Sequence, residues 1–321
     1  MSKVVALLRT PAARRIAIGT GVVTVLAAVG CATIQNRERE LTFRVVPGTA
    51  SWYSGLPDGV QEMYLPLPVG GAVQRIHAWW WPTAPDAPAI LYLHGSRWNL
   101  TGQLFRIEQL HEFGFSVLAI DYRGFGQSDG DLPSEKTVYE DARVAWQRLV
   151  ELQPDPALRF IYGHSLGGAV AVDLAAELSD QASAAGEPVA ARGLIIESSF
   201  TTLADIAKAL TAPWLPVQLL LSQTFDSVHK IARVRVPVFI VHGAADRYVP
   251  SRFSQELYDA APDPKKLLVV TNGTHNNSMR IGNGEYRAAL QEFFSLETLP
   301  AATHGSGAAH ASAAQNSPAA R

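Results

Sequence analysis

The sequence lacks the marks of several common protein classes. Its 321 residues include a single cysteine, Cys31, so no disulfide can form within the chain. The 27 basic and 29 acidic residues leave a net charge of −2, and no basic field points to a nucleic-acid partner. No spacing suggests a metal site, and the glycine-rich stretch Asp121–Gly130 lacks the Lys-Ser/Thr of a phosphate-binding loop. We therefore expect a protein that needs no metal and no other cofactor.

Acidic residues are also absent from the first 15 positions, which carry four basic side chains, and Ile16–Gly30 is apolar or small throughout. This pattern, ending in small residues, is typical of a secretory signal. Cys31 directly follows Gly30 and resembles the lipid-bearing cysteine of a bacterial lipobox, with Ala28 where leucine is usual. In this interpretation Cys31 is the lipidation site of a lipoprotein exported through the inner membrane.

An uncleaved single-pass anchor explains the same residues. Ile16–Ile34 contains no charge and is just long enough to cross a bilayer, and Arg14 and Arg15 would stay on the cytoplasmic side. A buried core helix is the third interpretation. The first two tether the protein to a membrane through its N-terminal segment, and they leave open on which face the domain lies.

The rest of the chain, in a sequence that is 47% hydrophobic, predicts one sizeable α/β domain. Strand-like runs at Leu41–Val46, Glu62–Leu67 and Val73–Trp81 come first, and Gly70-Gly71 suits a hairpin between the last two. From Ala89 on, near-continuous apolar runs alternate with helix-like stretches, which indicates a parallel sheet covered on both faces. We expect a mixed, mostly parallel sheet of about eight strands. The helix-like stretches include Ser134–Gln153, Gly167–Leu178 and Ser251–Ala260.

These patterns divide the chain into segments. Residues 1–36 hold the signal peptide or anchor, and residues 37–297 form the α/β domain, which begins with the charged spacer Arg37–Glu40. Residues 198–234 are a short cap insert, whose apolar side chains face either an acyl chain or their own neighbours. Residues 298–321 lack periodicity and are predicted to be a disordered low-complexity tail. The apolar cap residues are Trp214, Leu215, Leu219, Leu220 and Leu221.

A serine between two glycines, in the stretch "GHSLGG", is the most informative motif. Ser165 lies where the apolar run Arg159–Gly163 ends and a helix-like stretch begins at Gly167, the context that a G-x-S-x-G nucleophile needs. A sharp turn exposes the serine hydroxyl, and the helix N-terminus directs free N–H groups at the site. Because ligands of such sheets bind at the carboxyl ends of the strands, Ser165 is the candidate nucleophile. The alternative is a plain glycine-rich turn with a buried serine.

A serine hydroxyl becomes a nucleophile only when a base accepts its proton and a third group orients that base. In G-x-S-x-G enzymes the order along the chain is serine, acid, histidine. Asp246 and His275 follow two later apolar runs in this order and are the candidate acid and base. A helix N-cap or turn at Asp246 and a surface-loop histidine at His275 are the alternatives. His164 is interpreted as structural, His242 precedes the acid, and His77 is interpreted as an ordinary core or surface residue.

The tetrahedral intermediate of acyl transfer needs backbone N–H donors for its oxyanion. Leu166, directly after the nucleophile, should supply one donor, and the loop after an earlier strand the other. The stretch "LYLHGSRWNLTG" has the matching position, with the N–H of Ser96 as first choice and that of Arg97 as second. An ordinary His-Gly turn is the alternative.

In combination and order, the motifs "LHGS", "DYRGFGQSDG", "GHSLGG", "HGAADRYVP" and "GTHNN" resemble those of the serine α/β-hydrolase superfamily over about Leu41–Leu296. The stretches "ESSFTTLADIA", "PWLPVQLLL" and "FDSVHKIARVRVPVFIVHG" are similar to its Bem-like, serine-aminopeptidase-like branch of membrane-anchored proteins. Similar proteins often have "HGN" where this chain has "HGS", which leaves the oxyanion backbone intact. They also often have "GHND" where it has "GTHNN", which changes the surroundings of the base more than the base.

The resemblance implies the α/β-hydrolase fold with a short cap. It also implies a hydrolase that cleaves carboxylic (acyl) esters or thioesters through a Ser-His-Asp triad and an acyl-enzyme. Esterases, (lyso)phospholipases and acyl-protein thioesterases share this chemistry, so the expected partner is a small-molecule acyl ester or a lipid-like substrate. A serine peptidase is the alternative among hydrolases, and a non-catalytic membrane-anchored binding protein is the alternative outside them. The oligomeric state stays open.

Overall fold

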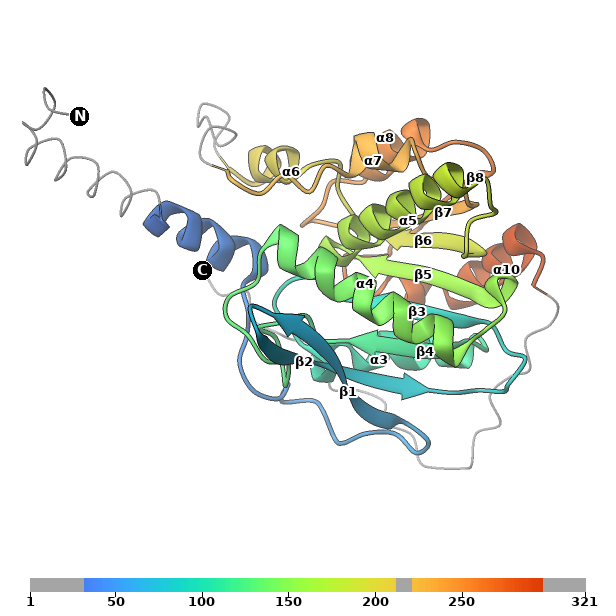
Figure 1. Cartoon of the computed structure of the whole chain (residues 1–321). Coiled ribbons are helices and arrows are strands. Elements are labelled where there is room, and N and C mark those ends of the chain that lie inside the picture. The colour runs from blue at the N-terminus through green and yellow to red at the C-terminus, as the bar shows by residue number, and fades with distance from the viewer. Residues whose placement is uncertain (1–31, 212–220, 297–321) are drawn as a thin grey trace, which may run out of the picture.

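The computed structural model describes residues 32–211 and 221–296 (Figure 1). A first helix over residues 32–43 precedes the labelled elements. In chain order these are β1 (Gln61–Val69), β2 (Ala72–Trp81), β3 (Ala89–Leu93), α3 (Leu100–Glu112), β4 (Ser116–Ile120), α4 (Glu135–Leu152), the 3-10 turn η1 (Pro156–Leu158), β5 (Arg159–His164), α5 (Leu166–Ala185), β6 (Gly193–Glu197), α6 (Leu203–Leu210), α7 (Ser227–Ile231), β7 (Val238–Gly243), α8 (Arg252–Ala260), β8 (Lys265–Val270), α9 (Ser278–Ile281) and α10 (Asn283–Phe294).

The strands form one eight-stranded sheet in the order β1-β2-β4-β3-β5-β6-β7-β8. The pairs β1–β2 and β2–β4 are antiparallel, and the pairs from β4 to β8 are parallel. The predicted mixed sheet and the hairpin at Gly70-Gly71 are confirmed. Both glycines have positive φ, of 56° and 87°, a conformation that glycine adopts without the steric cost of a Cβ.

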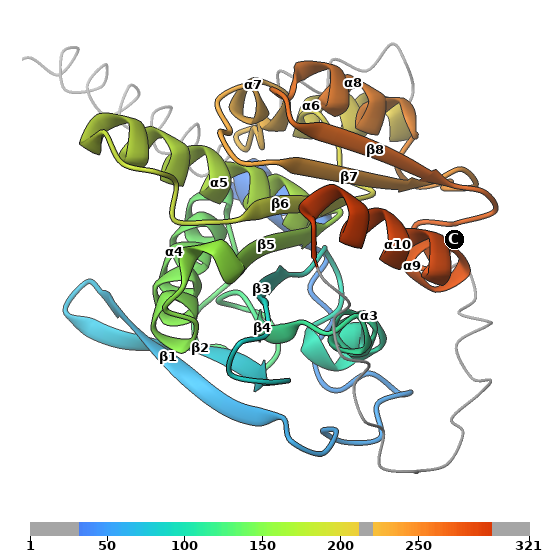
Figure 2. The same cartoon turned by 90° about the vertical axis from the view of Figure 1, so that its right-hand side faces the viewer.

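Helices cover both faces of the sheet, as Figure 2 shows. On one face, α4, α5, α7 and α8 bury apolar side chains in a core that includes Val138, Val170, Ile231 and Phe253. On the other face, α3, α9 and α10 contribute to a second core, in which Ile107 is a representative buried side chain. Because both faces are covered, the central strands are buried along their whole length, which explains their near-continuous apolar sequences.

The helix-like stretches all form helices. The predicted helix at Ser134–Gln153 is α4, whose N-terminus is closed by reciprocal hydrogen bonds between Ser134 and Thr137. The predicted helix that begins at Gly167 is α5, which runs to Ala185 and ends at Gly186, a left-handed C-cap.

The expected strand at Leu41–Val46 is wrong, and the expected spacer Arg37–Glu40 is also helical, because both fall within or beside the helix over residues 32–43. The alternation of apolar residues in this stretch is typical of a strand, yet burial follows a helical spacing. Glu38 and Phe43 are buried, whereas Leu41 is 65% exposed. The Phe43 ring packs against Phe125 and Phe225 with centroid distances of 6.5 and 6.1 Å. These contacts join the helix to the domain.

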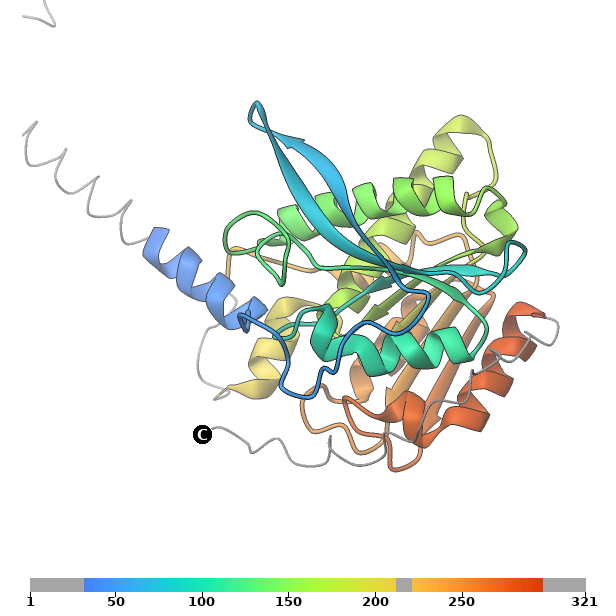
Figure 3. The same cartoon turned by 90° about the horizontal axis from the view of Figure 1, so that it is seen from below.

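The parallel strands end at the side of the sheet where the helix over residues 32–43 and α6 lie (Figures 1 and 3). The described part of the predicted cap insert holds α6 and α7. Within residues 32–211 and 221–296, no helix is long and apolar enough to cross a bilayer. The lipobox or anchor with Cys31, the tail at residues 298–321 and four of the apolar cap residues lie outside the described residues: Trp214, Leu215, Leu219 and Leu220.

Candidate active site

Ser165 occupies a strained turn between β5 and α5. Its backbone has φ 55° and ψ −119°, a combination that is uncommon for a residue with a side chain and costs of the order of 1–3 kcal/mol. Neighbouring groups hold the turn, since Ser165 N–H donates to the Glu197 carbonyl at 2.9 Å and the Ser199 hydroxyl donates to the Ser165 carbonyl at 3.0 Å. The turn leaves the Ser165 side chain half-buried at the strand end, where it faces a pocket.

The two glycines that flank this turn permit close backbone contacts. A Cβ on Gly163 would lie 2.1 Å from the Gly167 carbonyl oxygen, and a Cβ on Gly167 would lie 2.0 Å from the Leu93 carbonyl oxygen. Real Cβ atoms do not come so close to oxygen, so any side chain at either position would push α5 away from β3 and β5. This requirement explains why the motif has glycine on both sides of the serine.

The structure brings the predicted acid and base to this serine. His275 Nε2 lies 3.1 Å from Ser165 Oγ, and His275 Nδ1 lies 2.8 Å from Asp246 Oδ2. The three residues directly follow β5 or lie in the loops after β7 and β8, and the sheet brings these strand ends to one side. Ser165 and Asp246 are 81 residues apart along the chain, and Asp246 and His275 are 29 residues apart. The distances are those of hydrogen bonds, as a hydroxyl, a base and an orienting carboxylate require.

Both carboxylate oxygens of Asp246 have hydrogen-bond partners. Oδ1 accepts the N–H groups of Tyr248 and Val249 at 2.8 and 2.9 Å, while Oδ2 faces His275 and lies 3.3 Å from His242 Nε2. Burial raises the pKa of Asp246, but the hydrogen bonds from the two histidines outweigh it and hold the pKa well below its usual range. The carboxylate is therefore ionised. Ser251, not Asp246, is the N-cap of α8, so Asp246 forms a turn and faces the histidine.

The loop that carries His275 is held by the buried His164, which the sequence analysis interpreted as structural, and by the buried Arg106, which it did not name. His164 Nε2 lies 2.8 Å from the His275 carbonyl oxygen, and Arg106 donates to the Asn276 carbonyl at 3.3 Å. Burial, followed by the charge of Arg106, lowers the pKa of His164 far below its usual value, so this histidine is neutral and donates through Nε2–H. Arg106 pairs in turn with the buried Glu197 at 3.8 Å.

The candidate oxyanion donors lie on two sides of the serine. Leu166 begins α5 directly after Ser165, and Ser96 lies in the loop after β3. Among the described residues, no acceptor takes the N–H of either Leu166 or Ser96. The N–H of Arg97, the second choice, donates to the Phe43 carbonyl at 2.8 Å and is occupied. Of the two residues considered in this loop, Ser96 therefore has the available donor.

A pocket of about 710 Å³ opens above Ser165 and His275. Its wall is mostly apolar and comes from the loop after β3, from α6 and from the helix over residues 32–43. This size and composition are usual for sites that bind small molecules. Among the described residues, no group of three histidine, cysteine or acidic side chains is arranged to hold a metal ion. The apolar wall includes Ile34, Leu41, Phe200, Leu203, Ile206, Leu210 and Leu221.

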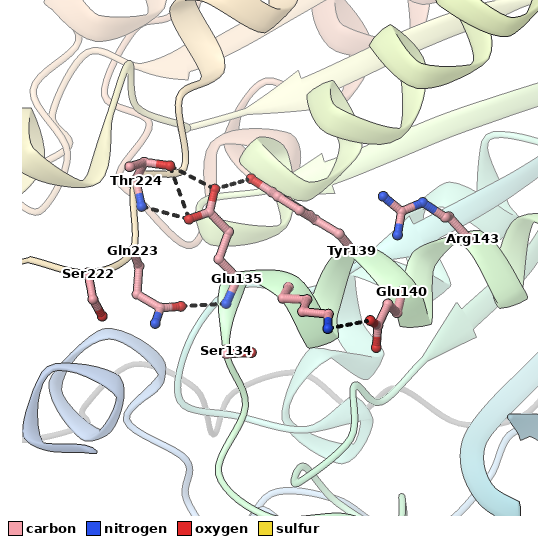
Figure 4. Close-up of a pocket in the computed structure, with 9 residues that line it drawn as sticks. Ser134, Glu135, Tyr139, Glu140, Arg143, Ser222, Gln223 and Thr224 are labelled. Atoms are coloured by element: carbon pink, nitrogen blue, oxygen red, sulfur yellow. Dashed lines mark hydrogen bonds and ion pairs between the residues drawn. The ribbon is translucent and has the colours of Figure 1, made fainter. Parts of the chain in front are cut away.

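A second hollow, of about 520 Å³, lies at the N-terminus of α4 (Figure 4). Its polar groups bond to one another, since the Glu135 carboxylate accepts the N–H groups of Thr224 and Phe225 at 2.6 and 2.9 Å and the hydroxyl of Tyr139 at 2.9 Å. Glu38 holds the same segment from the other side by accepting from Ser222 and Gln223. We interpret these hydrogen bonds as structural, because they fix residues 222–225, the segment that follows the undescribed part of the cap insert.

The sequence and the fold of this chain are similar to those of known hydrolases and of an uncharacterized protein. Residues 85–218 match the family described as serine aminopeptidase, S33. The chain is 35% identical over 222 residues to the uncharacterized protein Rv2307c of Mycobacterium tuberculosis, covering 68% of this chain and 74% of that protein. It is 34% identical over 197 residues to the lysophosphatidylserine lipase ABHD12 of Danio rerio, covering 56% and 49%. The esterase Pf2001 of Pyrococcus furiosus superposes with a TM-score of 0.60 at 19% identity, covering 79% and 98%.

Proposed function

Since this chain belongs to the α/β-hydrolase superfamily, we propose that it is a serine hydrolase that cleaves carboxylic (acyl) esters or thioesters. One observation carries the proposal: His275 lies between Asp246 and the hydroxyl of Ser165, at 2.8 and 3.1 Å, on the floor of an apolar pocket. This arrangement supplies a nucleophile, a base and the group that orients the base.

The reaction proceeds in two steps. Ser165 Oγ attacks the acyl carbonyl while its proton moves to His275 Nε2, and the N–H groups of Leu166 and Ser96 stabilise the oxyanion. His275 then protonates the leaving alcohol or thiol, which departs and leaves Ser165 acylated. Water, deprotonated by His275, attacks the acyl-enzyme, and the carboxylic acid leaves as His275 returns the proton to Ser165 Oγ. Asp246 stays ionised throughout and stabilises the imidazolium, consistent with its lowered pKa.

The pocket favours an acyl chain over a peptide N-terminus. An aminopeptidase needs a carboxylate to receive the substrate ammonium group, and Glu38 is the one acidic side chain among the described residues that line the pocket. Glu38 is 7% exposed, and Ser222 and Gln223 occupy it through hydrogen bonds. The apolar wall suits a hydrocarbon chain instead. ABHD12, whose name describes a lysophosphatidylserine lipase, supports lipid-like esters as the substrate class.

A membrane tether is part of the same proposal. The described part of the first helix, residues 32–43, adjoins Cys31 in the sequence and lines the pocket through Ile34 and Leu41. A lipidated Cys31 or an anchor at Ile16–Ile34 would therefore hold the pocket close to a lipid surface. A membrane-derived ester could then reach Ser165 without passing through bulk water.

Labelling by a fluorophosphonate probe tests the assignment of Ser165 in the full chain. We expect the wild type to be labelled and Ser165→Ala to be unlabelled, with hydrolysis of p-nitrophenyl butyrate reduced by about 10⁴-fold or more. Ser198→Ala is the matched control, because Ser198 is a buried serine just past the adjacent strand β6 and its hydroxyl has no partner among the described residues. A folded wild type without labelling would reject the proposal in favour of a binding protein.

A further inference from the structure

Two arginines on the wall of the candidate active site have no role in the proposed reaction. Arg44 and Arg97 both line the pocket that contains Ser165, and both are exposed. Among the described residues, no carboxylate forms an ion pair with either guanidinium group. Arg37, the third arginine of this wall, differs because it pairs with Glu40 at 2.6 Å. Two unpaired cations therefore lie on the wall of the candidate active site.

The backbone holds the two arginines in a defined relation to each other. Arg97 N–H donates to the Phe43 carbonyl at 2.8 Å, and Val46 N–H donates to the Arg97 carbonyl at 2.8 Å. Arg44 and Arg97 also have positive φ, of 49° and 81°. For residues with a side chain, this conformation costs of the order of 1–3 kcal/mol and persists only where the surrounding structure imposes it. The two hydrogen bonds join the Arg97 backbone to Phe43 and Val46, on either side of Arg44 in the chain, and both arginines line one pocket.

The charge of the pocket wall is not balanced. Its one acidic residue among the described residues, Glu38, is buried and accepts three hydrogen bonds from Ser222 and one from Gln223. The net charge on the wall is therefore positive, and it adjoins the apolar surface formed by Leu41 and α6. A ligand that matches both parts has a hydrocarbon chain and an anionic group.

We propose that Arg44 and Arg97 form a subsite for the phosphate group of an acyl-ester substrate, so that the enzyme selects lysophospholipids with a negatively charged headgroup. This inference rests on the proposed function, in which Ser165 attacks the acyl carbonyl. The acyl chain lies on the apolar wall, and the glycerophosphate of the leaving alcohol reaches the arginines. A guanidinium group suits this role, since its planar N–H fork donates two parallel hydrogen bonds to phosphate oxygens.

A pair of short-chain esters tests the subsite. Hexanoyl lysophosphatidylglycerol carries the phosphate and hexanoylglycerol does not, and both are used below the concentration at which they form micelles. We measure the ratio of kcat/KM for the phosphate ester to kcat/KM for the neutral ester. We expect Arg44→Gln with Arg97→Gln to lower this ratio at least tenfold, or about 1.4 kcal/mol, mainly through KM. The double lysine variant should restore most of it, because lysine keeps the charge.

Arg235→Gln is the matched control. Arg235 is exposed, precedes β7 at the opposite end of the sheet and does not line the pocket. We expect the ratio of this variant to stay within twofold of the wild type. An unchanged ratio in the double glutamine variant overturns the subsite. An equal loss on both esters also overturns it, because the arginines would then shape the pocket without reading the phosphate.

A binding experiment separates failure of the subsite from failure of the proposed function. Ser165→Ala is titrated with an ether analogue of lysophosphatidylglycerol, which contains no ester to cleave. The double glutamine substitution should weaken this binding at least tenfold, whether or not Ser165 is a nucleophile. Inorganic phosphate and glycerol 3-phosphate are the second probes. If either binds as tightly as the ether lipid, the site recognises a free phosphate and the lipid part of the proposal is overturned.

Discussion

His77 and His275 each face an aspartate through one ring nitrogen, and they differ in the type of group that faces the other nitrogen. Nδ1 of each histidine lies 2.8 Å from an aspartate Oδ2, which belongs to Asp121 for His77 and to Asp246 for His275. Nε2 of His77 faces Glu62 at 2.8 Å, whereas Nε2 of His275 faces the Ser165 hydroxyl at 3.1 Å. A histidine–aspartate pair therefore does not by itself identify a catalytic base. A candidate base is distinguished by the group that faces its second ring nitrogen and by whether the histidine lines a pocket.

The second partner decides which protonation state each histidine can use. Burial lowers the pKa of His77, but the hydrogen bonds and charges of Asp121 and Glu62 outweigh burial, and the net shift raises the pKa. Both nitrogens of His77 then donate to carboxylates, and neither is left to accept a proton. His275 faces a hydroxyl, so its Nε2 can accept the proton of Ser165 while Nδ1 donates to Asp246. His77 is 1% exposed, and His275 lines the pocket.

The largest expected effect separates the two histidines by activity and stability. His275→Ala should lower kcat for a p-nitrophenyl ester by about 10⁴-fold or more and change the free energy of unfolding little. His77→Ala removes the partner of Oδ2 in the buried Asp121 carboxylate and should cost about 3 kcal/mol of stability. Its activity per folded molecule should stay within a few-fold of the wild type. Urea unfolding and active-site titration of the folded fraction measure both. A 10⁴-fold loss of activity in His77→Ala would contradict the comparison.

The next effect concerns the aspartates. Asp246→Asn cannot hold His275 in the tautomer that accepts from Ser165, so kcat should fall by about 10³–10⁴-fold. Asp121→Asn removes a charge partner of His77 and a stronger acceptor for the Leu100 N–H, which lies 2.8 Å from Asp121 Oδ1. It should lower stability by about 2–3 kcal/mol with a far smaller loss of kcat. Equal losses of kcat in the two variants would show that the aspartates do not differ in role.

The sequence was sufficient to predict that Ser165, Asp246 and His275 would meet. Each follows an apolar run, and parallel strands bring their carboxyl ends to one edge of a sheet. The hydrogen bonds and ion pairs that position these three residues were not predictable, because they come from segments far away in the sequence. Arg106 holds the Asn276 carbonyl across 170 residues of chain, and no local pattern in α3 marks it. Likewise, the order rule set His242 aside, although it lies 3.3 Å from Asp246.

Short apolar runs are a further limit of sequence interpretation. The alternating residues at Leu41–Val46 fit a strand, and only the packing of Phe43 against Phe125 and Phe225 shows why the chain is helical up to residue 43. The same packing bears on the choice between the two candidate oxyanion donors in the loop after β3. Phe43 lies beside the loop after β3, and its carbonyl accepts a hydrogen bond from the N–H of Arg97. Among the described residues, the N–H of Ser96 has no acceptor. A choice that the sequence left open thus depends on a tertiary contact.

A pH series sharpens the contrast at smaller amplitude. His77 has a raised pKa in the folded protein, so its contribution to stability is full below the unfolded value of about 6.5 and is lost as the pH rises through the folded pKa. The difference in unfolding free energy between the wild type and His77→Gln should therefore be larger at pH 5.5 than at pH 9. Burial lowers the pKa of His94, so its contribution has the opposite pH dependence, but His94 is present in both proteins. A difference that does not change with pH would mean that His77 is neutral when folded.

The smallest effect tests whether the second carboxylate, rather than the first, distinguishes His77 from His275. The Glu62 side chain is 39% exposed and also accepts from Gln127 at 3.1 Å, so solvent screens its charge. Glu62→Gln should therefore cost less than about 1 kcal/mol of unfolding free energy near neutral pH. It should also reduce the pH dependence of stability, because one of the two anions that raise the pKa of His77 is gone. Urea unfolding at pH 5.5 and pH 9 measures both quantities, and Gln127→Ala controls for the lost side-chain contact. If Glu62→Gln leaves the pH dependence intact, Asp121 alone sets the charge of His77. The two histidines would then differ in burial and pocket access, not in their second partner.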